Sequence, residues 1–286
     1  MTRGLSAEER RALESLVGWW DAAGVETLPV DPPARAAPER KSTPPSAAET
    51  VRERRPAGAP RATPAQARAA GYARDHGEDA PAHDGRAMAN AAGDLDALRA
   101  ALESFEGCAL KHTARNLVFS RGTPKSRVMV VGEGPGREED EQGAPFVGRS
   151  GKLLDRMLAS IGLDPAEVYV SNVVFWRPPG NRKPTDAEIE ACRPFAERHI
   201  ALAEPEVLVF AGGIAAQTLL HAKSGIMSLR GRWAEYRVHG PDGAETATIP
   251  ALPVFHPAFL LHRPGEKAKA WRDMLSLHAR LGGLGG

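Results

Sequence analysis

One stretch decides the fold of this chain: RVMVVGEGPGREEDEQGAPFVGRSG, residues 127–151. Its first residues are mostly apolar and stop at glycines, which is typical of a buried parallel strand that ends in a loop. Beyond Ser150, apolar residues recur every three or four positions as far as Ile161, so an amphipathic helix is expected there. A strand, a glycine-rich loop and a helix in this order indicate an α/β domain.

The same alternation continues toward the C-terminus. Apolar runs predict further strands at residues 168–170, 207–210 and 253–255, and a more exposed strand at 233–238. Helices are expected over 185–199, 213–220 and 271–281, the first of them with Thr185 and Glu188 in capping-box spacing. The predicted fold class is therefore α/β, a three-layer sandwich with a central, mainly parallel sheet.

The N-terminal third has a different composition. Residues 1–26 predict a short helix, because Leu13, Leu16, Val17 and Trp20 fall on one face. Residues 27–93 are rich in Ala, Pro, Arg, Glu and Ser, and such a segment buries too little apolar surface to fold, so a disordered linker is expected. The folded domain is expected over 94–286. The N-terminal helix is expected to dock on this domain or on nothing, and the alternative is that the arm binds an unidentified protein.

The bulk properties exclude several classes of protein. The chain has 286 residues, a formal net charge of +1 and two cysteines, so neither a disulfide framework nor a uniformly basic surface is expected. No apolar run is long enough for a transmembrane helix, and no signal peptide opens the chain. We expect a cytoplasmic protein without a membrane partner.

Polar side chains follow the predicted strands where each one ends. Glu133 follows the first strand, Asn172 closes the second and His256 follows the last. Because ligands bind beyond the carboxyl ends of parallel strands, these three side chains are expected to converge on one crevice. Taken singly, each of them also has a structural interpretation, since Asn172 could cap a turn and His256 could be a surface turn residue.

The loop Gly132–Gly136 superficially resembles a dinucleotide-binding loop. That fingerprint requires G-x-G-x-x-G opening directly into a helix. Here the third glycine comes one place too early, and Pro135 removes a backbone N–H that could face phosphate. A nucleotide-binding α/β enzyme therefore remains only a weak alternative.

Four ordered motifs together carry a more specific resemblance. They are Val131–Gly151, Asn172–Arg182 (with Arg177-Pro178-Pro179 inside it), Leu229–Gly231 and His256–Leu261. In order and spacing they closely resemble the motifs of family 4 (iron–sulfur type) uracil-DNA glycosylases, from about Phe105 to the C-terminal helix. The resemblance implies the uracil-DNA glycosylase-like fold and an enzyme of base excision repair that hydrolyses the N-glycosidic bond of flipped-out uracil in DNA.

The resemblance also implies roles for the two catalytic residues. Glu133 would position water and stabilise the positive charge that builds on the sugar. His256 would donate a hydrogen bond to uracil O2, where negative charge develops.

Four residues are implied to bind the substrate base. Asn172 would pair with the O4 and N3–H edge of uracil, which cytosine presents with opposite polarity. Phe146 would stack on the flipped base, Glu139 would exclude the methyl group of thymine, and Gly134 belongs to the same substrate-binding set. Phe146 could alternatively be an ordinary core residue.

The DNA backbone and the gap left by the flipped base need contacts of their own. The resemblance and the local basic charge predict DNA-binding residues in the same loops: Arg177, Arg182, Arg230, Leu260, Leu261 and Arg263. The two leucines suit a wedge that fills the vacated position in the duplex. They could instead pack beneath the last helix.

The cluster of the family is the feature that fits least. Relatives hold a 4Fe-4S cluster with four cysteines, but only Cys108 and Cys192 match ligand positions, and Phe105 and Trp176 occupy the other two. We therefore expect a chemistry that requires no cofactor, with aromatic packing in place of the cluster. A monomer acting on uracil-containing DNA is expected, and the alternative is a uracil- or abasic-DNA-binding protein with weak or no catalysis.

Overall fold

The computed structural model describes residues 80–283. These residues contain a five-stranded sheet in the order β2-β1-β3-β5-β4. The strands are β1 (Val128–Gly132), β2 (Tyr169–Asn172), β3 (Val207–Ala211), β4 (Ala234–His239) and β5 (Glu245–Val254). The first three and β5 run parallel, whereas β4 pairs antiparallel with β5. The predicted mainly parallel sheet is confirmed.

Helices flank the sheet on both faces. The longer ones are α3 (Ala80–Ala91), α4 (Leu95–Ser104), α6 (Arg149–Ala159), α7 (Asp186–Ala203), α8 (Gly213–Leu220) and α11 (Lys267–Gly283). The short helices are α5 (Arg137–Gln142), α9 (Ile226–Leu229) and α10 (Pro257–His262), with 3-10 turns η1 (Ala109–His112), η2 (Pro179–Asn181) and η3 (Pro264–Glu266). No helix of the described range combines the length and the apolar character needed to cross a bilayer.

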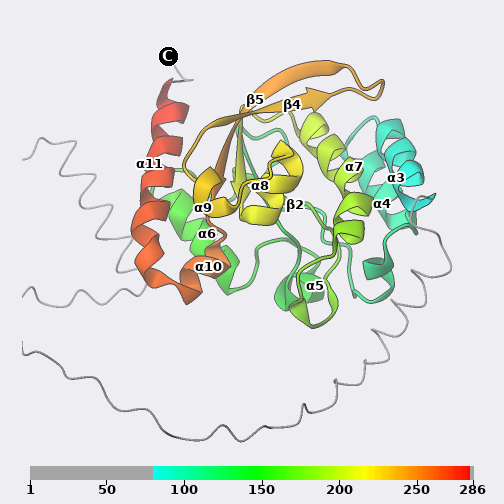
Figure 1. Cartoon of the computed structure of the whole chain (residues 1–286), viewed down its shortest axis with the longest axis horizontal. Helices are drawn as coiled ribbons and strands as arrows, with labels where there is room; N and C mark the ends of the chain where they lie inside the picture. Colours follow the sequence, from blue (N-terminus) through cyan, green and yellow to red (C-terminus); the bar gives the residue numbers. More distant parts are fainter. Residues whose placement is uncertain (1–79, 284–286) are drawn as a thin grey trace, which may run out of the picture.

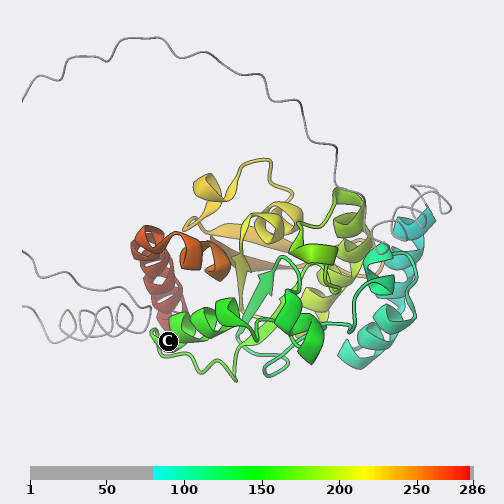
Figure 2. The same cartoon turned by 90° about the horizontal axis from the view of Figure 1, so that it is seen from below.

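Alternate residues of the strands divide the core into two layers. On β1, Met129 and Val131 pack with α4, α7 and α8, whereas Val128 and Val130 pack with α6 and α11. Figures 1 and 2 show α6, α10 and α11 on one side of the sheet and α3, α4 and α7 on the other. The three-layer sandwich is therefore confirmed.

Local sequence signals explain where several elements begin and end. The side chain of Thr185 accepts a hydrogen bond from the backbone N–H of Glu188, and the Glu188 carboxylate accepts one from the backbone N–H of Thr185. These two bonds form the capping box predicted for α7. The strand predicted at 253–255 is longer than expected, because β5 begins at Glu245 and forms a hairpin with β4. The polar first half of β5 gave no apolar pattern from which to predict it.

The linker predicted over 27–93 is wrong at its C-terminal end. Residues Ala80–Ala91 form α3, which packs against α7. Arg86 pairs with Glu197 at 3.2 Å, and the carbonyl oxygen of Ala92 accepts hydrogen bonds from the guanidinium of Arg198 at 2.7 and 3.0 Å. The domain thus begins before residue 94. The helix predicted within 1–26 and the rest of the linker lie outside the described residues.

Candidate active site

The ends of the parallel strands bring the predicted side chains together. Gly132, the last residue of β1, is in register with Asn172, the last residue of β2. β5 ends at Val254, whose carbonyl oxygen accepts a hydrogen bond from the backbone N–H of Gly212 at 2.9 Å. Glu133 comes directly after β1, and His256 comes two residues after the end of β5, so all three polar residues lie at one edge of the sheet.

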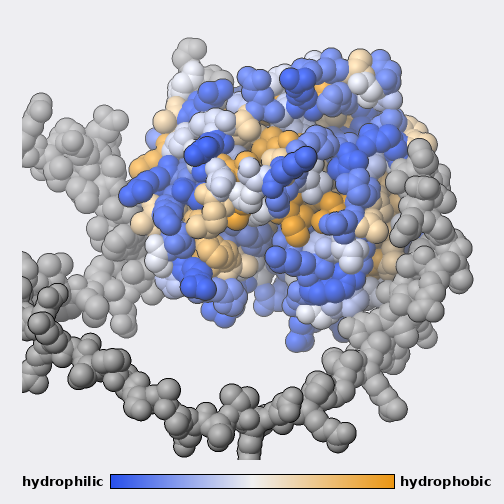
Figure 3. Space-filling model, in the orientation of Figure 1, coloured by the Kyte–Doolittle hydropathy of each residue, from blue (hydrophilic) through white to orange (hydrophobic). Residues whose placement is uncertain are grey.

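A cleft of about 260 Å³ opens at this edge. Its lining includes all six residues predicted to act on the base or in catalysis: Glu133, Gly134, Glu139, Phe146, Asn172 and His256. Residues 178, 181, 182 and 184 form another wall. The rest of the surface is mostly hydrophilic on the face that Figure 3 shows, with apolar residues gathered near its middle.

The amide of Asn172 is buried at the floor of the cleft. Its side chain is 2% exposed, and Oδ1 has no hydrogen-bond partner among the described residues. A Cβ atom at Gly132 would lie 2.5 Å from both this oxygen and the Phe146 ring, so only glycine fits there. A buried acceptor without a partner costs about 1–3 kcal/mol, which a ligand N–H would offset.

Phe146 is held against the cleft in a conformation unusual for its residue type. Its φ is 53°, in the left-handed region, and its side chain is buried. The ring stacks against His256 with centroids 5.4 Å apart and planes inclined by 28°. The backbone of Gly151 packs so closely against the Phe146 backbone that a Cβ there would clash. The surroundings of Phe146 therefore fix its ring next to the imidazole.

Glu139 ties the two cleft loops to each other. One carboxylate oxygen accepts the backbone N–H of Gly136 at 3.1 Å, and the other accepts those of Val147 and Gly148 at 3.1 and 2.9 Å. These bonds use both oxygens of a side chain that also lines the cleft. Beyond the predicted contact with the base, Glu139 therefore holds the loop that carries Phe146.

His256 is set up as a neutral hydrogen-bond donor. Its Nδ1 accepts the backbone N–H of Ala258 at 3.2 Å as the N-cap of α10. Burial lowers the pKa of His256 to about 4, although the charge of Glu139 opposes this shift. The ring is therefore neutral near pH 7, and its proton is on Nε2, the nitrogen that Ala258 does not use.

Glu133 is half-buried in the same cleft. Burial raises the pKa of its carboxyl group, and the positive charge of Lys183 opposes the rise. The ionised form of this group has reduced hydration and lies in the field of the Lys183 ammonium group. Such a carboxylate suits a role beside developing positive charge.

Several predicted DNA contacts have partners inside the protein. The guanidinium of Arg182 makes two hydrogen bonds to Glu188, at 2.8 and 2.6 Å. Arg230 pairs with Asp273 and lies over the Phe255 ring. Arg230 therefore does not fit the predicted DNA contact, because its charge is neutralised inside the domain, and the sequence gave no sign of a partner 43 residues away.

The predicted wedge also needs correction. Leu260 is 0% exposed and belongs to the core, and Leu261 packs against the same core. Helix α10 begins at Pro257, which is buried. Leu260 comes three positions later and therefore lies on the same, buried face of the helix. Phe259 is instead the exposed apolar side chain of this helix, at 37%. Arg263 is exposed at the end of α10, as a DNA contact requires.

The residues at the cluster positions do not fit an iron–sulfur cluster. Cys108 and Cys192 lie together, with their sulfur atoms 3.8 Å apart, but both are buried and only two thiols are available. Phe105 and Trp176 are 1% and 3% exposed, and the Phe105 ring packs against Phe195 at 4.9 Å. Within residues 80–283 no three His, Cys, Asp or Glu side chains form a group that could hold a metal.

Comparison with known proteins agrees with this fold and site. Residues 119–275 match the uracil DNA glycosylase superfamily, which defines the class of the domain. The type-4 uracil-DNA glycosylase of Archaeoglobus fulgidus is 38% identical over 174 residues, 59% of this chain and 84% of the relative. Those of Pyrobaculum aerophilum and Thermotoga maritima are 34% and 38% identical, and the match spans 63% and 57% of this chain and 91% and 80% of the relatives. The chain belongs to the type-4 uracil-DNA glycosylase family.

Proposed function

We propose that this protein is a uracil-DNA glycosylase that removes uracil from DNA and leaves an abasic site. The observation that carries the proposal is the buried, unpartnered Oδ1 of Asn172 at the floor of the cleft. An acceptor in this position calls for a ligand N–H, and the relatives named type-4 uracil-DNA glycosylases indicate which ligand supplies it.

Asn172 would select uracil by polarity. Its Oδ1 would accept the N3–H of uracil, while its Nδ2 would donate to O4. Cytosine carries an acceptor at N3 and a donor at C4, so both groups of the amide would then be left unpaired in a buried site. Such a mismatch discriminates strongly, because buried polar groups without partners are costly.

His256 and Glu133 would act on the bond that breaks. The N1–C1′ bond would cleave with its electron pair leaving on uracil, so negative charge would grow at O2 and positive charge on the sugar. The neutral imidazole would donate from Nε2 to O2, and one such donor contributes about 10²–10³-fold in rate. The Glu133 carboxylate would stabilise the sugar cation and orient the water that adds to C1′.

Phe146 and Glu139 would complete the base pocket. The Phe146 ring, fixed beside His256, offers a face on which the flipped base can stack and so regain part of the stacking lost in the duplex. Glu139 holds that ring's loop through three backbone hydrogen bonds and would exclude the methyl group of thymine.

The proposal includes chemistry without a cofactor and action as a monomer in the cytoplasm. All groups named above belong to the chain, and the Cys108–Cys192 pair offers half the thiolates that a 4Fe-4S cluster requires. The arm before residue 80 is proposed to be dispensable for cutting uracil, with binding of an unidentified protein as the alternative role.

The test is cleavage of an oligonucleotide with a single uracil, followed by alkali to break the strand at abasic sites. Matched oligonucleotides with thymine or cytosine at the same position are the controls. We expect cutting at uracil alone. A folded protein that binds the uracil strand without cutting it would favour the binding-protein alternative.

A further inference from the structure

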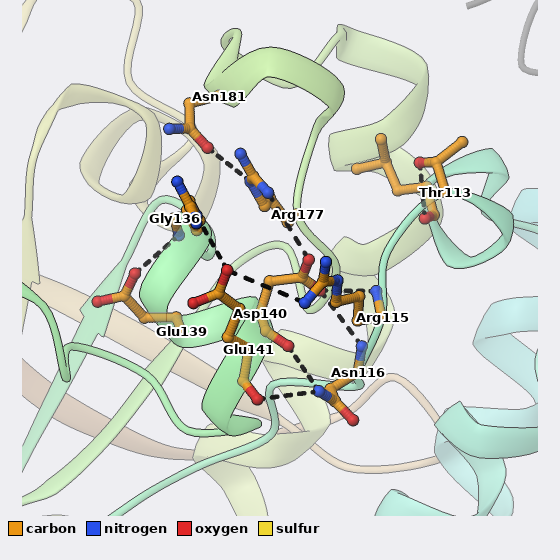
Figure 4. A network of polar contacts seen from close by, with 11 residues as sticks. Thr113, Arg115, Asn116, Gly136, Glu139, Asp140, Glu141, Arg177 and Asn181 are labelled. Atoms are coloured by element: carbon orange, nitrogen blue, oxygen red, sulfur yellow. Dashed lines mark hydrogen bonds and ion pairs between the residues drawn. The ribbon is translucent and has the colours of Figure 1, made fainter. Parts of the chain in front are cut away.

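A buried carboxylate behind the cleft joins three segments of the chain. Asp140 is 2% exposed, and its Oδ1 accepts the backbone N–H groups of Arg115 and Asn116 at 2.8 and 3.2 Å. The Asn116 side chain in turn donates to the backbone carbonyl of Asp140 at 2.6 Å. Figure 4 shows Asp140 between these groups and Arg177. Asp140 is not among the residues that line the cleft, so the catalytic groups described above do not explain its burial.

Arg177 connects Asp140 to Asn181, a residue of the cleft lining. Its Nη1 lies 3.8 Å from Asp140 Oδ2, and its Nε donates to Asn181 Oδ1 at 2.6 Å. The sequence predicts Arg177 as a DNA-backbone contact. The structure instead turns its guanidinium inward, between an anchored carboxylate and an amide.

Asn181 is the end of this chain of contacts, and it lines the cleft. A guanidinium has only donors, so the amide oxygen must face Arg177. The Nδ2 donor is therefore on the opposite side, turned away from Arg177 in Figure 4. No hydrogen bond of Nδ2 to another described residue accompanies the bond at Oδ1.

The position of Asn181 indicates which part of a substrate it would meet. It lines the cleft together with Pro178, Arg182 and Pro184. The positive charge of Lys183, in the same segment of the chain, lowers the pKa of Glu133. Asn172, Phe146 and His256, the residues proposed to bind the base, line the same cleft from other segments of the chain. Asn181 belongs instead to the segment whose Lys183 acts on Glu133, the residue proposed to act at the sugar. Its donor would therefore meet the sugar and phosphate of the flipped nucleotide rather than its base.

We propose that Asn181 contacts substrate, donating from Nδ2 to the sugar–phosphate of the flipped nucleotide, and that Asp140 and Arg177 are positioning residues that aim it. This inference rests on the proposed uracil-excising function. In this proposal Arg177 holds the Asn181 side chain in position and does not bind a DNA phosphate.

The backbone offers a competing explanation for Asn181. Its φ is 54°, directly after Gly180 at 67°, and asparagine is among the residues that tolerate this left-handed region best. Two substitutions separate the explanations. Asn181→Gly keeps the backbone freedom and removes the amide, whereas Asn181→Asp keeps the acceptor for Arg177 and removes the donor.

Two further variants test the positioning residues. Arg177→Lys keeps the charge near Asp140 but removes the Nε donor to Asn181. Asp140→Asn keeps an acceptor for the two backbone N–H groups but removes the charge that faces Arg177. Arg137→Gln is the matched control, since this exposed arginine pairs within residues 80–283 with Glu141 of its own short helix and does not line the cleft.

The experiment measures single-turnover cutting of a single-uracil duplex over a series of salt concentrations, with thermal unfolding of each variant. We expect both Asn181 variants to lose about 10- to 100-fold, as for a hydrogen bond to a charged group. Arg177→Lys and Asp140→Asn should lose about 10-fold, since small displacements of catalytic geometry are costly. In Arg177→Lys the salt dependence should match that of the wild type, and Arg137→Gln should cut normally.

Three results would overturn the inference while the wild type cuts uracil. They are full activity in Asn181→Gly, full activity in Asn181→Asp, and full activity in Arg177→Lys, the last as expected of a simple phosphate contact that lysine can replace. A folded wild type that cuts no uracil would instead overturn the proposed function itself.

Discussion

Asn172 and Phe146 are each in a state that lowers the stability of the folded protein, and no contact within residues 80–283 removes the unfavourable feature. The amide oxygen of Asn172 is buried without a hydrogen bond, and Phe146 has a left-handed backbone at 53°. Each of these features costs on the order of 1–3 kcal/mol. Both groups border the same cleft, where a bound base would use them, so the cost is consistent with a site selected for binding rather than for stability.

The pH dependence of cutting should reflect the ionisation of the Glu133 carboxyl group. Its carboxyl pKa is raised by burial, so the active carboxylate is lost as pH falls through a value above 4.5, while His256, with a pKa of about 4, stays neutral there. The charge of Lys183 lowers the Glu133 pKa. We therefore expect Lys183→Gln to move the acid limb of the kcat/KM profile to higher pH. A limb that stays in place or moves to lower pH would contradict this assignment.

At the scale of elements, helix α10 carries two neighbouring apolar residues with different exposure: Leu260 lies in the core and Phe259 at the surface. Leu260→Ala should destabilise the protein by about 2–5 kcal/mol, because it empties a fully buried position. Phe259→Ala should cost less stability than Leu260→Ala, because Phe259 is 37% exposed, although its ring packs on Phe255. It should reduce cutting of duplex more than of single-stranded DNA, because only a duplex leaves a gap to fill. Thermal unfolding and cutting of the two substrates measure both effects. Equal losses on both substrates for Phe259→Ala would count against a wedge.

The sequence predicted the elements whose signals are local. The apolar run at 128–131, the capping box at Thr185 and the polar residues at the strand ends all led to the structure that is observed. The rotation of α10 and the partner of Arg230 depend on tertiary packing, so Leu260 and Arg230 were assigned to DNA wrongly. The motif containing Asp140 was visible, but a run of acidic residues does not reveal which one is buried.

Helix α3 shows a second limit of prediction from composition. Its residues are small and polar, with little apolar pattern of their own. It nevertheless packs closely on the domain, since a Cβ at Gly85 would lie 3.2 Å from Phe105 and 3.3 Å from Phe195. The stability of this helix therefore comes from its contacts with α7 and Phe105 and not from its own sequence.

At the scale of the whole molecule, the N-terminal boundary of the active domain can be located by truncation. Removal of residues 1–79 should leave unfolding and uracil cutting unchanged. Removal of residues 1–93 also deletes α3 with its Arg86–Glu197 pair and should cost about 2–4 kcal/mol. Thermal unfolding of the two truncated proteins makes the comparison. Identical melting temperatures would show that α3 does not stabilise the domain.

At the same scale, we propose that the protein requires no metal. Phe105 and Trp176 fill two of the four ligand positions and are nearly fully buried, so the core there depends on aromatic packing. We expect protein purified without oxygen to contain no stoichiometric iron and to lack visible absorbance. Chelators should change neither its melting temperature nor its cutting rate. About four irons per chain would contradict this view.

The removal of uracil by this cleft is tested by the single-uracil cutting assay with wild type, Asn172→Asp and His256→Ala in parallel. We expect efficient abasic-site formation by the wild type. Asn172→Asp should be sharply reduced because it loses the donor to O4, and His256→Ala should be slower by about 10²–10³-fold because it loses the donor to O2. Full activity in either folded variant would contradict the assignment of the cleft as the site that selects and excises uracil.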